Sequence, residues 1–220
     1  MSFTGIINST DTQLLLAINS MHSTYLDNFM FLFSNKFVWI AFYASLLAYF
    51  IIKGGKQSIW IIIALILCIA LSDQISSGLI KDLVQRPRPT REPGILPLLH
   101  IVNGYTGGRY GFVSSHAANT IGLAILTSAV FKNKTYTIAI ILWAIITSYS
   151  RIYLGVHYPL DILGGLAVGT LVSLLILYVL NKKTNATSLY TMKNPKTFPN
   201  YLPTLTLLLS VGFILVWSFF

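Results

Sequence analysis

The amino-acid sequence predicts an all-α integral membrane protein, a helical bundle of about six transmembrane helices preceded by an N-terminal amphipathic helix. Hydrophobic residues make up 55% of the 220 residues, and only 10% are charged. A soluble domain usually carries about 25% charged residues. The apolar residues also occur in long runs, and a spanning helix needs roughly 20 mostly apolar residues. Both observations favour one compact domain within a bilayer.

Six apolar runs are candidates for the spans, and the first and last of them are short. We expect an N-terminal interfacial segment (residues 1–36), a core of five transmembrane helices (37–180), and a basic segment with an additional helix (181–220). The predicted spans cover residues 37–53, 57–80, 115–132, 135–154, 160–180 and 203–220.

Residues 10–33 differ from these runs because polar and apolar side chains alternate along them. The apolar set is Leu14, Leu15, Ile18, Met21, Leu26, Met30 and Leu32, and the polar set is Asp11, Asn19, His22, Ser23 and Asp27. This mixture is typical of an amphipathic helix that lies in the membrane interface. An ordinary cap over the end of the bundle is the alternative.

The lysines predict how the bundle is oriented. They fall in alternate loops, which the positive-inside rule assigns to the cytoplasm. Both ends of the chain are then expected outside. The lysines concerned are Lys53, Lys56, Lys132, Lys134, Lys182, Lys183, Lys193 and Lys196.

The net charge of +9 admits several kinds of partner, including nucleic acid, anionic lipid and an anionic substrate. Nucleic acid is excluded because the charges lie in short loops between apolar runs. Cys68 is the only cysteine, so no intramolecular disulfide can form, and its apolar surroundings indicate a core residue.

Three short polar clusters interrupt the apolar sequence, each at the end of a predicted span. The last of them reads Ser150-Arg151-x5-His157-x3-Asp161. His157 and Asp161 are four residues apart at a helix start, so they share one face. A carboxylate there would fix the tautomer of the imidazole, leaving its other nitrogen free to attack phosphorus. Arg151 could bind the same phosphate in a bidentate manner.

The other two clusters supply an acid and further cations. Ser114-Ser115-His116 precedes an apolar run, where serines cap helices and the free N–H groups attract anions. His116 in that first turn could protonate a leaving oxygen. Lys81 and Arg88 belong to Lys81-x6-Arg88-Pro89 and could share the oxygens of a phosphoryl group.

Each cluster alone has an ordinary structural interpretation as a cap, a helix start or a cation that reaches the lipid headgroups. Because all three clusters are predicted on one face of the membrane and have complementary chemical roles, together they indicate a phosphate-handling site far more specifically than any one of them does alone. His116, His157 and Asp161 could in principle bind a metal, but the surrounding cations argue against it. The neighbouring Arg86 is a further phosphate-binding candidate, with a solvated surface position as the alternative.

Together the three clusters resemble the signature of the type-2 phosphatidic acid phosphatase superfamily, which shares its site with vanadium haloperoxidases. That signature reads K-x6-R-P, P-S-G-H and S-R-x5-H-x3-D, and the first and third parts are complete here. In the second part Val113 replaces proline and Ser115 replaces glycine, while Ser114 and His116 are kept. Because Ser115 still offers a backbone N–H, we expect activity to survive. The resemblance covers residues 37–180.

The resemblance implies a phosphatase core and a role for each site residue. His157 would be the nucleophile, Asp161 would orient it, and His116 would be the general acid and then the base for water. No cofactor and no metal are implied. The expected phosphate-binding residues are Lys81, Arg88, Ser114, Ser115 and Arg151.

The expected function is hydrolysis of a phosphomonoester or diphosphate on a lipid headgroup, through a phosphohistidine. Bacterial undecaprenyl-diphosphate, lipid A and phosphatidylglycerophosphate phosphatases share this core. The expected location is therefore a bacterial cell membrane, with the active site on the extracytoplasmic side. The expected partners are the phosphorylated lipid and membrane lipids, with no nucleic acid and no obligate protein partner.

Two other function classes stay open. A non-catalytic membrane protein that binds anionic headgroups would not need His116 or the pair of His157 and Asp161. A vanadate-dependent haloperoxidase would be expected to have a soluble composition.

Overall fold

The structure, a computed structural model, describes residues 3–53, 56–183 and 200–220, with side chains described for residues 9–52, 58–183 and 200–220. Within these residues the elements are helical, and Pro87 and Tyr110 form an isolated β-bridge. The predicted all-α bundle is confirmed.

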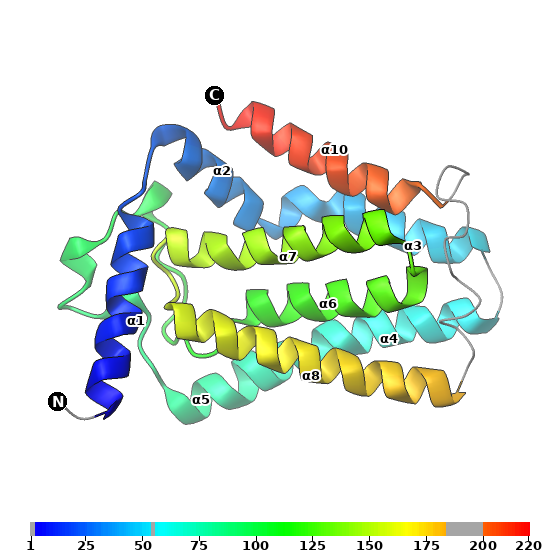
Figure 1. The fold of residues 1–220 in the computed structure, drawn as a ribbon, viewed down its shortest axis with the longest axis horizontal. Helices are drawn as coiled ribbons and strands as arrows, with labels where there is room; N and C mark the ends of the chain where they lie inside the picture. The colour runs from blue at the N-terminus through cyan, green and yellow to red at the C-terminus, as the bar shows by residue number, and fades with distance from the viewer. Residues whose placement is uncertain (1–2, 54–55, 184–199) are drawn as a thin grey trace.

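Four helices run side by side along the long axis of the molecule (Figure 1). They are α4 (Lys56–Asp73), α6 (Ser115–Phe131), α7 (Lys134–Tyr153) and α8 (Pro159–Lys183). The central helix α6 packs against the other three. The ends of α6, α7 and α8 match the predicted spans to within a few residues, and α4 begins within one residue of its predicted start.

Local capping explains where these helices begin. The Ser114 hydroxyl accepts a hydrogen bond from Ala117 N at 3.4 Å and caps α6, as predicted. The Asn133 side chain accepts one from Tyr136 N at 2.8 Å and caps α7. Helix α8 begins at Pro159, whose missing N–H costs nothing in a first turn.

The second predicted span continues beyond residue 80. A π-helical segment, η2 (Gln74–Ile80), follows α4, and a short helix, α5 (Lys81–Val84), follows that. Together they form one apolar helix from Ser58 to Val84. Wide π turns often occur at functional sites, and this one directly precedes Lys81.

The structure does not confirm the count of six spans. Within the described residues, three helices are long and apolar enough to cross a membrane, and a fourth results if one bent pair counts as a single span. The three are Ser58–Val84, Lys134–Tyr153 and Pro159–Lys183. Helices α6 and α10 (Leu202–Trp217) are apolar but have only 17 and 16 residues.

The N-terminal segment forms two helices where the sequence predicted one interfacial helix over residues 10–33. Helix α1 (Phe3–Asn19) lies across one end of the bundle against α7 and α8 (Figure 1). Helix α2 (Thr24–Ser34) starts at a new N-cap, because the Ser23 hydroxyl accepts a hydrogen bond from Leu26 N. Helix α1 therefore caps the bundle, the alternative considered above.

The first predicted span, residues 37–53, matches an apolar helical stretch over Lys36–Ile52, and the chain bends just before it. Asn35 caps a short 3-10 segment, η1 (Lys36–Trp39), and α3 (Ile40–Lys53) follows. The pair Thr24–Ser34 and Lys36–Ile52 is bent by 62°. Trp39 fixes the bend through its indole N–H, which donates to the Phe33 carbonyl at 3.0 Å.

The additional C-terminal helix α10 packs along this bent pair and α7 (Figure 1). The hydroxyls of Ser45 on α3 and Thr206 on α10 are 2.7 Å apart. Near the other end of α10, Asn28 on α2 donates a hydrogen bond to the Ser218 carbonyl at 3.3 Å. These contacts attach α10 to both sides of the bend.

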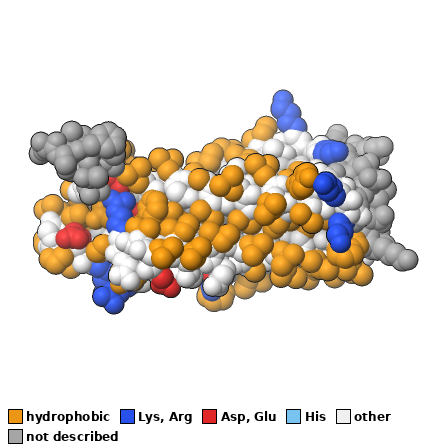
Figure 2. Space-filling model, turned by 90° about the horizontal axis from the view of Figure 1, so that it is seen from below, with side chains coloured by type: hydrophobic (Ala, Val, Ile, Leu, Met, Phe, Trp, Pro, Cys, Tyr) orange, Lys and Arg blue, Asp and Glu red, His pale blue; other side chains and the backbone are white. Residues whose placement is uncertain are grey.

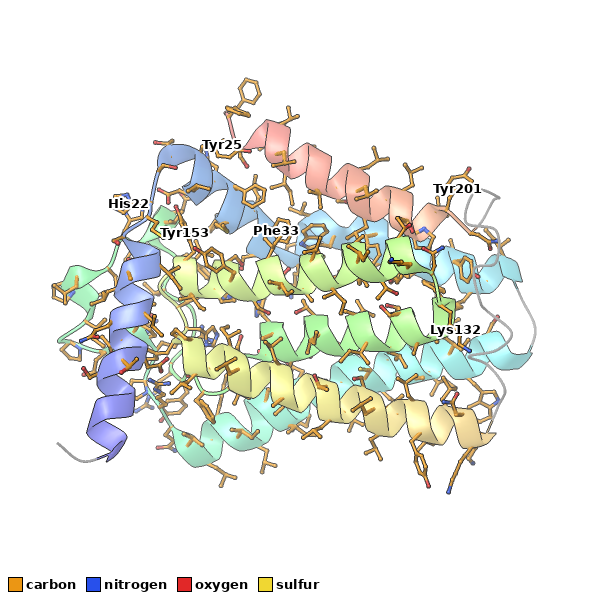
Figure 3. The ribbon with its side chains drawn as sticks, in the orientation of Figure 1. His22, Tyr25, Phe33, Lys132, Tyr153 and Tyr201 are labelled. Atoms are coloured by element: carbon orange, nitrogen blue, oxygen red, sulfur yellow. The ribbon has the colours of Figure 1, made fainter. Side chains whose placement is uncertain are left out.

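The exposed surface along the helices is mostly apolar, with charged side chains gathered toward the two ends (Figure 2). Lys132 lies at the end opposite His22 and Tyr153 (Figure 3). This placement agrees with the predicted separation of the lysine loops from the polar clusters. The side chains of Lys53, Lys56, Lys193 and Lys196 lie outside the described residues.

Close packing of α6 on α8 depends on glycine. A Cβ atom at Gly169 would overlap the Ala118 carbonyl, and one at Gly165 would overlap the Ser114 carbonyl. We therefore expect Gly169→Ala to destabilise the protein by about 1–3 kcal/mol, since overpacking forces the backbones apart. The thermal midpoint of the detergent-solubilised protein measures this loss. Gly212→Ala is the matched helical control, because a Cβ there meets nothing within 4 Å. Equal midpoints for the two variants would contradict the prediction.

Candidate active site

The three polar clusters meet at the end of the bundle that α1 covers. Helices α6 and α8 begin at this end, and α5 and α7 finish there. The long connection between α5 and α6 lies beside the short one between α7 and α8, where Arg88 Nη1 donates to the Val156 carbonyl at 3.1 Å, and beside the start of α8, where Ser114 N donates to the Asp161 carbonyl at 2.9 Å. The sequence-predicted residues at this end are Lys81, Arg88, Ser114, Ser115, His116, Arg151, His157 and Asp161.

His157 and Asp161 form the contact that their spacing predicted. The imidazole Nδ1 lies 3.2 Å from Asp161 Oδ2, and His157 is only 1% exposed. The same carboxylate oxygen accepts a hydrogen bond from Tyr158 N at 3.1 Å. The carboxylate is held in place because it accepts hydrogen bonds from both groups. The Nδ1 atom of His157 therefore carries the proton, and Nε2 keeps its lone pair.

Arg88 enters the site from the long connection and is held by two carbonyl groups. Its Nε donates to Tyr110 O at 3.0 Å and its Nη1 to Val156 O at 3.1 Å. The side chain is buried, with the residue 8% exposed. Burial, together with the charge of Arg151, lowers the pKa of Arg88 to about 10, so it stays charged at neutral pH.

Arg151 is buried at the end of α7, with the residue 2% exposed. Its Nη1 donates to the Ser34 hydroxyl and its Nη2 to the Tyr105 hydroxyl, the latter at 2.8 Å. Its Nε is buried without a hydrogen-bond partner. A buried donor of this kind is costly unless a ligand satisfies it.

Lys81 approaches from α5 toward the first turn of α6. Its Nζ lies 3.4 Å from the Ser77 hydroxyl and 3.5 Å from the Ser115 hydroxyl. Ser115 thus faces a cation of the site, whereas the hydroxyl of Ser114 is used for capping. Ser114 remains beside the site through its backbone contact to Asp161.

The electrostatic environment keeps His157 neutral. Burial lowers its pKa well below 6.5, and the charges of Arg88, Arg151 and Lys81 lower it further. Desolvation and nearby like charge both disfavour an imidazolium. A neutral imidazole at pH 7 is the form that can act as a nucleophile.

Two cavities meet at His116. One, of about 350 Å³, has polar walls from Ser34, Asn35, Lys36 and Arg151, along with aromatic residues. The other, of about 320 Å³, runs along α6 and has both apolar walls (Tyr43, Ile69, Leu123 and Trp143) and polar walls (Asp73, Ser115, Asn119 and Thr120). Lys36 borders both cavities. Because each cavity combines polar and apolar walls, the pair suits an amphiphilic molecule.

Sequence reasoning gave no site role to Lys36 or Asp11, and it considered Arg86 only as a phosphate-binding or a solvated residue. Lys36 stands at the bend between α2 and α3, and only the bend brings it to His116. Arg86 is neither a solvated cation nor free for phosphate, because it pairs with Asp11 at 2.6 Å and Asp161 at 3.0 Å. Asp11 carried one signal: it lies four residues before Leu15, on the buried face of α1.

The chemistry of this arrangement follows from its unbalanced charge. Arg88 and Arg151 are buried, and neither pairs with a carboxylate within the described residues. Unpaired buried cations are unfavourable without a counter-ion. The site is therefore built to receive an anion beside a neutral, oriented imidazole.

Comparison with known proteins agrees with this chemistry. A family model described as the PAP2 superfamily matches residues 61–185. The lipid A 4'-phosphatase of Bacteroides thetaiotaomicron is 40% identical over 81% of this chain and 80% of its own length. That of Porphyromonas gingivalis is 38% identical over 76% of this chain and 71% of its own length.

More distant relatives share the same scaffold. The undecaprenyl-diphosphatase BcrC of Bacillus subtilis is 28% identical over 71% of this chain and 76% of its own length. The crystal structure of a transmembrane PAP2-type phosphatidylglycerolphosphate phosphatase from Bacillus subtilis matches with a TM-score of 0.61. That match covers 83% of this chain and 90% of the other, at 22% identity, and it supports the fold.

Proposed function

Because this chain belongs to the PAP2 superfamily, we propose that it is a membrane lipid phosphatase that forms a phosphohistidine at His157. The observation that carries the proposal is the pair of buried, uncompensated arginines around a neutral imidazole whose Nδ1 is held by a carboxylate. A dianionic phosphate would supply the missing negative charge. The buried Nε of Arg151 would supply one donor to it.

In the first step, Nε2 of His157 attacks phosphorus and the bond to the leaving oxygen breaks. Asp161 stabilises the positive charge that develops on the imidazole. His116, which borders both cavities, starts this step as the imidazolium, a form that the negative charge of the bound phosphate favours, and gives its proton to the leaving oxygen. Lys81, Arg88 and Arg151 stabilise the charge on the non-bridging oxygens.

In the second step, water attacks the phosphohistidine. His116 accepts a proton from that water, the phosphorus–nitrogen bond breaks, and its electron pair returns to Nε2. Inorganic phosphate leaves, and both histidines regain their starting protonation states.

The substrate we propose is a phosphomonoester on the headgroup of a lipid of the lipid A 4'-phosphate type. Two relatives with this printed activity are 40% and 38% identical to the chain. The two cavities that border His116 combine polar and apolar walls, which suits an amphiphile.

Release of inorganic phosphate from a panel of lipids tests this function. The panel contains lipid A phosphorylated only at position 4', lipid A phosphorylated only at position 1, undecaprenyl diphosphate and phosphatidylglycerophosphate, each in detergent micelles. We expect the highest kcat/KM for the 4'-phosphorylated lipid. A higher value for another lipid would reassign the substrate, and no release from any of them would overturn the function.

Activity should not depend on a divalent metal. Lys81, Arg88 and Arg151 provide the positive charge that a metal would otherwise supply to the phosphoryl oxygens. We expect wild-type turnover after dialysis against EDTA, with no gain when Mg²⁺ or Zn²⁺ is added. Loss of activity in EDTA that Mg²⁺ restores would contradict this prediction.

The active site should face away from the cytoplasm. Lys132 and Lys134 mark the opposite end of the bundle, which the positive-inside rule places inside. Single cysteines at Gly108 and Thr135, in a Cys68→Ala background, can be tested with an impermeant thiol reagent on intact cells or spheroplasts. We expect labelling at position 108 only.

The choice of these positions keeps the structure intact. A Cβ at Gly108 meets nothing within 4 Å, whereas one at Gly107 would lie 2.8 Å from Arg88 Nη1. Thr135 is exposed and leaves the Asn133 cap in place. Labelling at 135 but not at 108 would reverse the orientation. Gly54, a comparable position in another lysine loop, lies outside the described residues.

A further inference from the structure

A buried carboxylate on the N-terminal helix contacts residues beside the candidate active site. Asp11 is only 3% exposed and lies on the face of α1 that also buries Leu15. It stands outside residues 61–185, the part that matches the family model. A buried charge persists only where it is paired and hydrogen-bonded, so its partners show what α1 holds in place.

Asp11 joins two parts of the site that are far apart in the sequence. Its Oδ1 accepts a hydrogen bond from Leu160 N, in the first turn of α8, at 2.9 Å. Its Oδ2 accepts one from Arg86 Nη2 at 2.6 Å. Helix α1 is thereby attached to both the long connection and α8.

Arg86 continues the contact to the catalytic carboxylate. Its Nη1 donates to Asp161 Oδ1 at 3.0 Å, while Asp161 Oδ2 is left for His157 and the Tyr158 amide. The guanidinium also lies over the Tyr158 ring, 3.9 Å from its centroid. Each group of Asp11, Arg86, Asp161 and His157 thus contacts the next.

We propose that Asp11 and Arg86 are positioning residues for catalysis: α1 uses Asp11 to hold Arg86, and Arg86 fixes the orientation and the effective charge of Asp161 behind His157. This inference rests on the proposed role of His157 as nucleophile. It makes the N-terminal helix part of the catalytic apparatus.

The physical effect of Arg86 is to offset part of the negative charge of the Asp161 carboxylate. An uncompensated Asp161 would stabilise the imidazolium of His157, and fewer molecules would hold the neutral nucleophile. The other charged or titratable groups that act on His157 are all cations or imidazoles: Lys81 from α5, Arg88 from the long connection, His116 from α6 and Arg151 from α7. Arg86 is the cation that contacts Asp161 directly.

A purely structural role makes different predictions from a positioning role. If Asp11 only caps α8 and fastens α1, its loss should lower stability without moving the titration of His157. If Asp11 acts through Arg86, the reductions of kcat caused by substituting Asp11 and by substituting Arg86 should not multiply in the double variant.

The kinetic test is a double-mutant cycle with 4'-monophosphorylated lipid A in detergent micelles. We expect Arg86→Gln to lower kcat by about 10- to 100-fold, as loss of a supporting contact does at other sites, with KM changed by less than about threefold. Asp11→Asn should lower kcat less: Leu160 N and Arg86 contact different oxygens of Asp11, and in the variant one of these becomes an NH2 group that cannot accept, so one of the two hydrogen bonds is lost. The double variant should be no slower than Arg86→Gln alone.

Two further variants complete the test. One separates the charge of Arg86 from its hydrogen-bond geometry, and the other controls for a general loss of structure at this end of the molecule. Arg86→Lys keeps the positive charge but cannot bridge both carboxylates, so we expect a wild-type acid limb in the pH profile with a reduced kcat. Asp27→Asn is the matched control, because Asp27 binds His100 at 2.8 Å and Tyr153 at 2.7 Å at the same end of the molecule. Any reduction of kcat by Asp27→Asn should multiply with the reduction caused by Arg86→Gln, since the two sites are independent.

The second test needs no substrate. Nitrogen-15 NMR of labelled histidines in the solubilised protein follows the titration of His157, assigned through His157→Asn. We expect Arg86→Gln to move this titration to higher pH and Asp27→Asn to leave it unchanged. If wild type hydrolyses no lipid phosphate, the proposed function fails while this measurement still decides the inference. Multiplying losses for Asp11→Asn and Arg86→Gln, or an unmoved His157 titration in Arg86→Gln, would overturn it.

Discussion

His157→Ala should lower kcat by about four orders of magnitude or more and abolish the phosphoenzyme, because no other group can take the place of the nucleophile. The wild-type intermediate contains a phosphorus–nitrogen bond, which is stable in alkali and labile in acid. Quenching the reaction of a ³²P-labelled lipid phosphate in alkali should therefore leave label on the wild-type protein. The same sample should lose the label on acidification.

His100→Ala is the control for this experiment. His100 lies at the same end of the bundle, stacked on His22 with ring centroids 3.9 Å apart and bound to Asp27, and it has no contact with His157. The control should still form phosphoenzyme. Turnover at the wild-type rate by His157→Ala, or label that survives acid, would exclude the phosphohistidine mechanism.

His116→Asn should slow the hydrolysis of a lipid phosphate by about 10²- to 10⁴-fold, the usual contribution of a general acid. The loss should be much smaller in the first step with nitrophenyl phosphate, because nitrophenolate leaves without a proton. The second step still needs His116 as the base for water. The variant should therefore release a burst of nitrophenolate, about one per active site, and accumulate phosphoenzyme.

Asn119→Ala provides the comparison, because Asn119 borders the same cavity as His116 and carries no titratable group. Its effect should be similar for the lipid phosphate and for nitrophenyl phosphate. Equal losses on the two substrates in His116→Asn, with no burst, would show that His116 does not transfer the proton.

The sequence by itself determined the features that depend on neighbours along the chain. Apolar runs located α6, α7 and α8 to within a few residues, because a helix in a bilayer must be apolar along its length. Ser114 and Pro159 marked the starts of α6 and α8, since capping and proline act within one turn. The spacing of His157 and Asp161 predicted their contact for the same reason.

Local patterns could not show where the apolar runs bend. The sequence placed the start of the first span at residue 37 but did not show the 62° bend that Asn35 and Trp39 stabilise there. It also joined residues 10–33 into one helix, although Ser23 starts a second. In each case a hydrogen bond between a side chain and the backbone competes with continuation of the helix. The composition of the segment does not reveal whether that hydrogen bond forms.

Only the tertiary structure decided how the charges of the site are paired. Arg86 stands 75 residues from both Asp11 and Asp161, and Arg151 stands 117 residues from Ser34. No periodicity reports a contact at such distances, because the packing of α1, α2, α7 and α8 brings these groups together. Burial then makes each pairing matter, since in the low-dielectric interior a charge must be satisfied by whatever the fold places beside it. The motifs thus indicated the candidate catalytic groups. The packing of the helices determined that Arg86 pairs with both Asp11 and Asp161, and that the buried Arg88 and Arg151 have no carboxylate partner among the described residues.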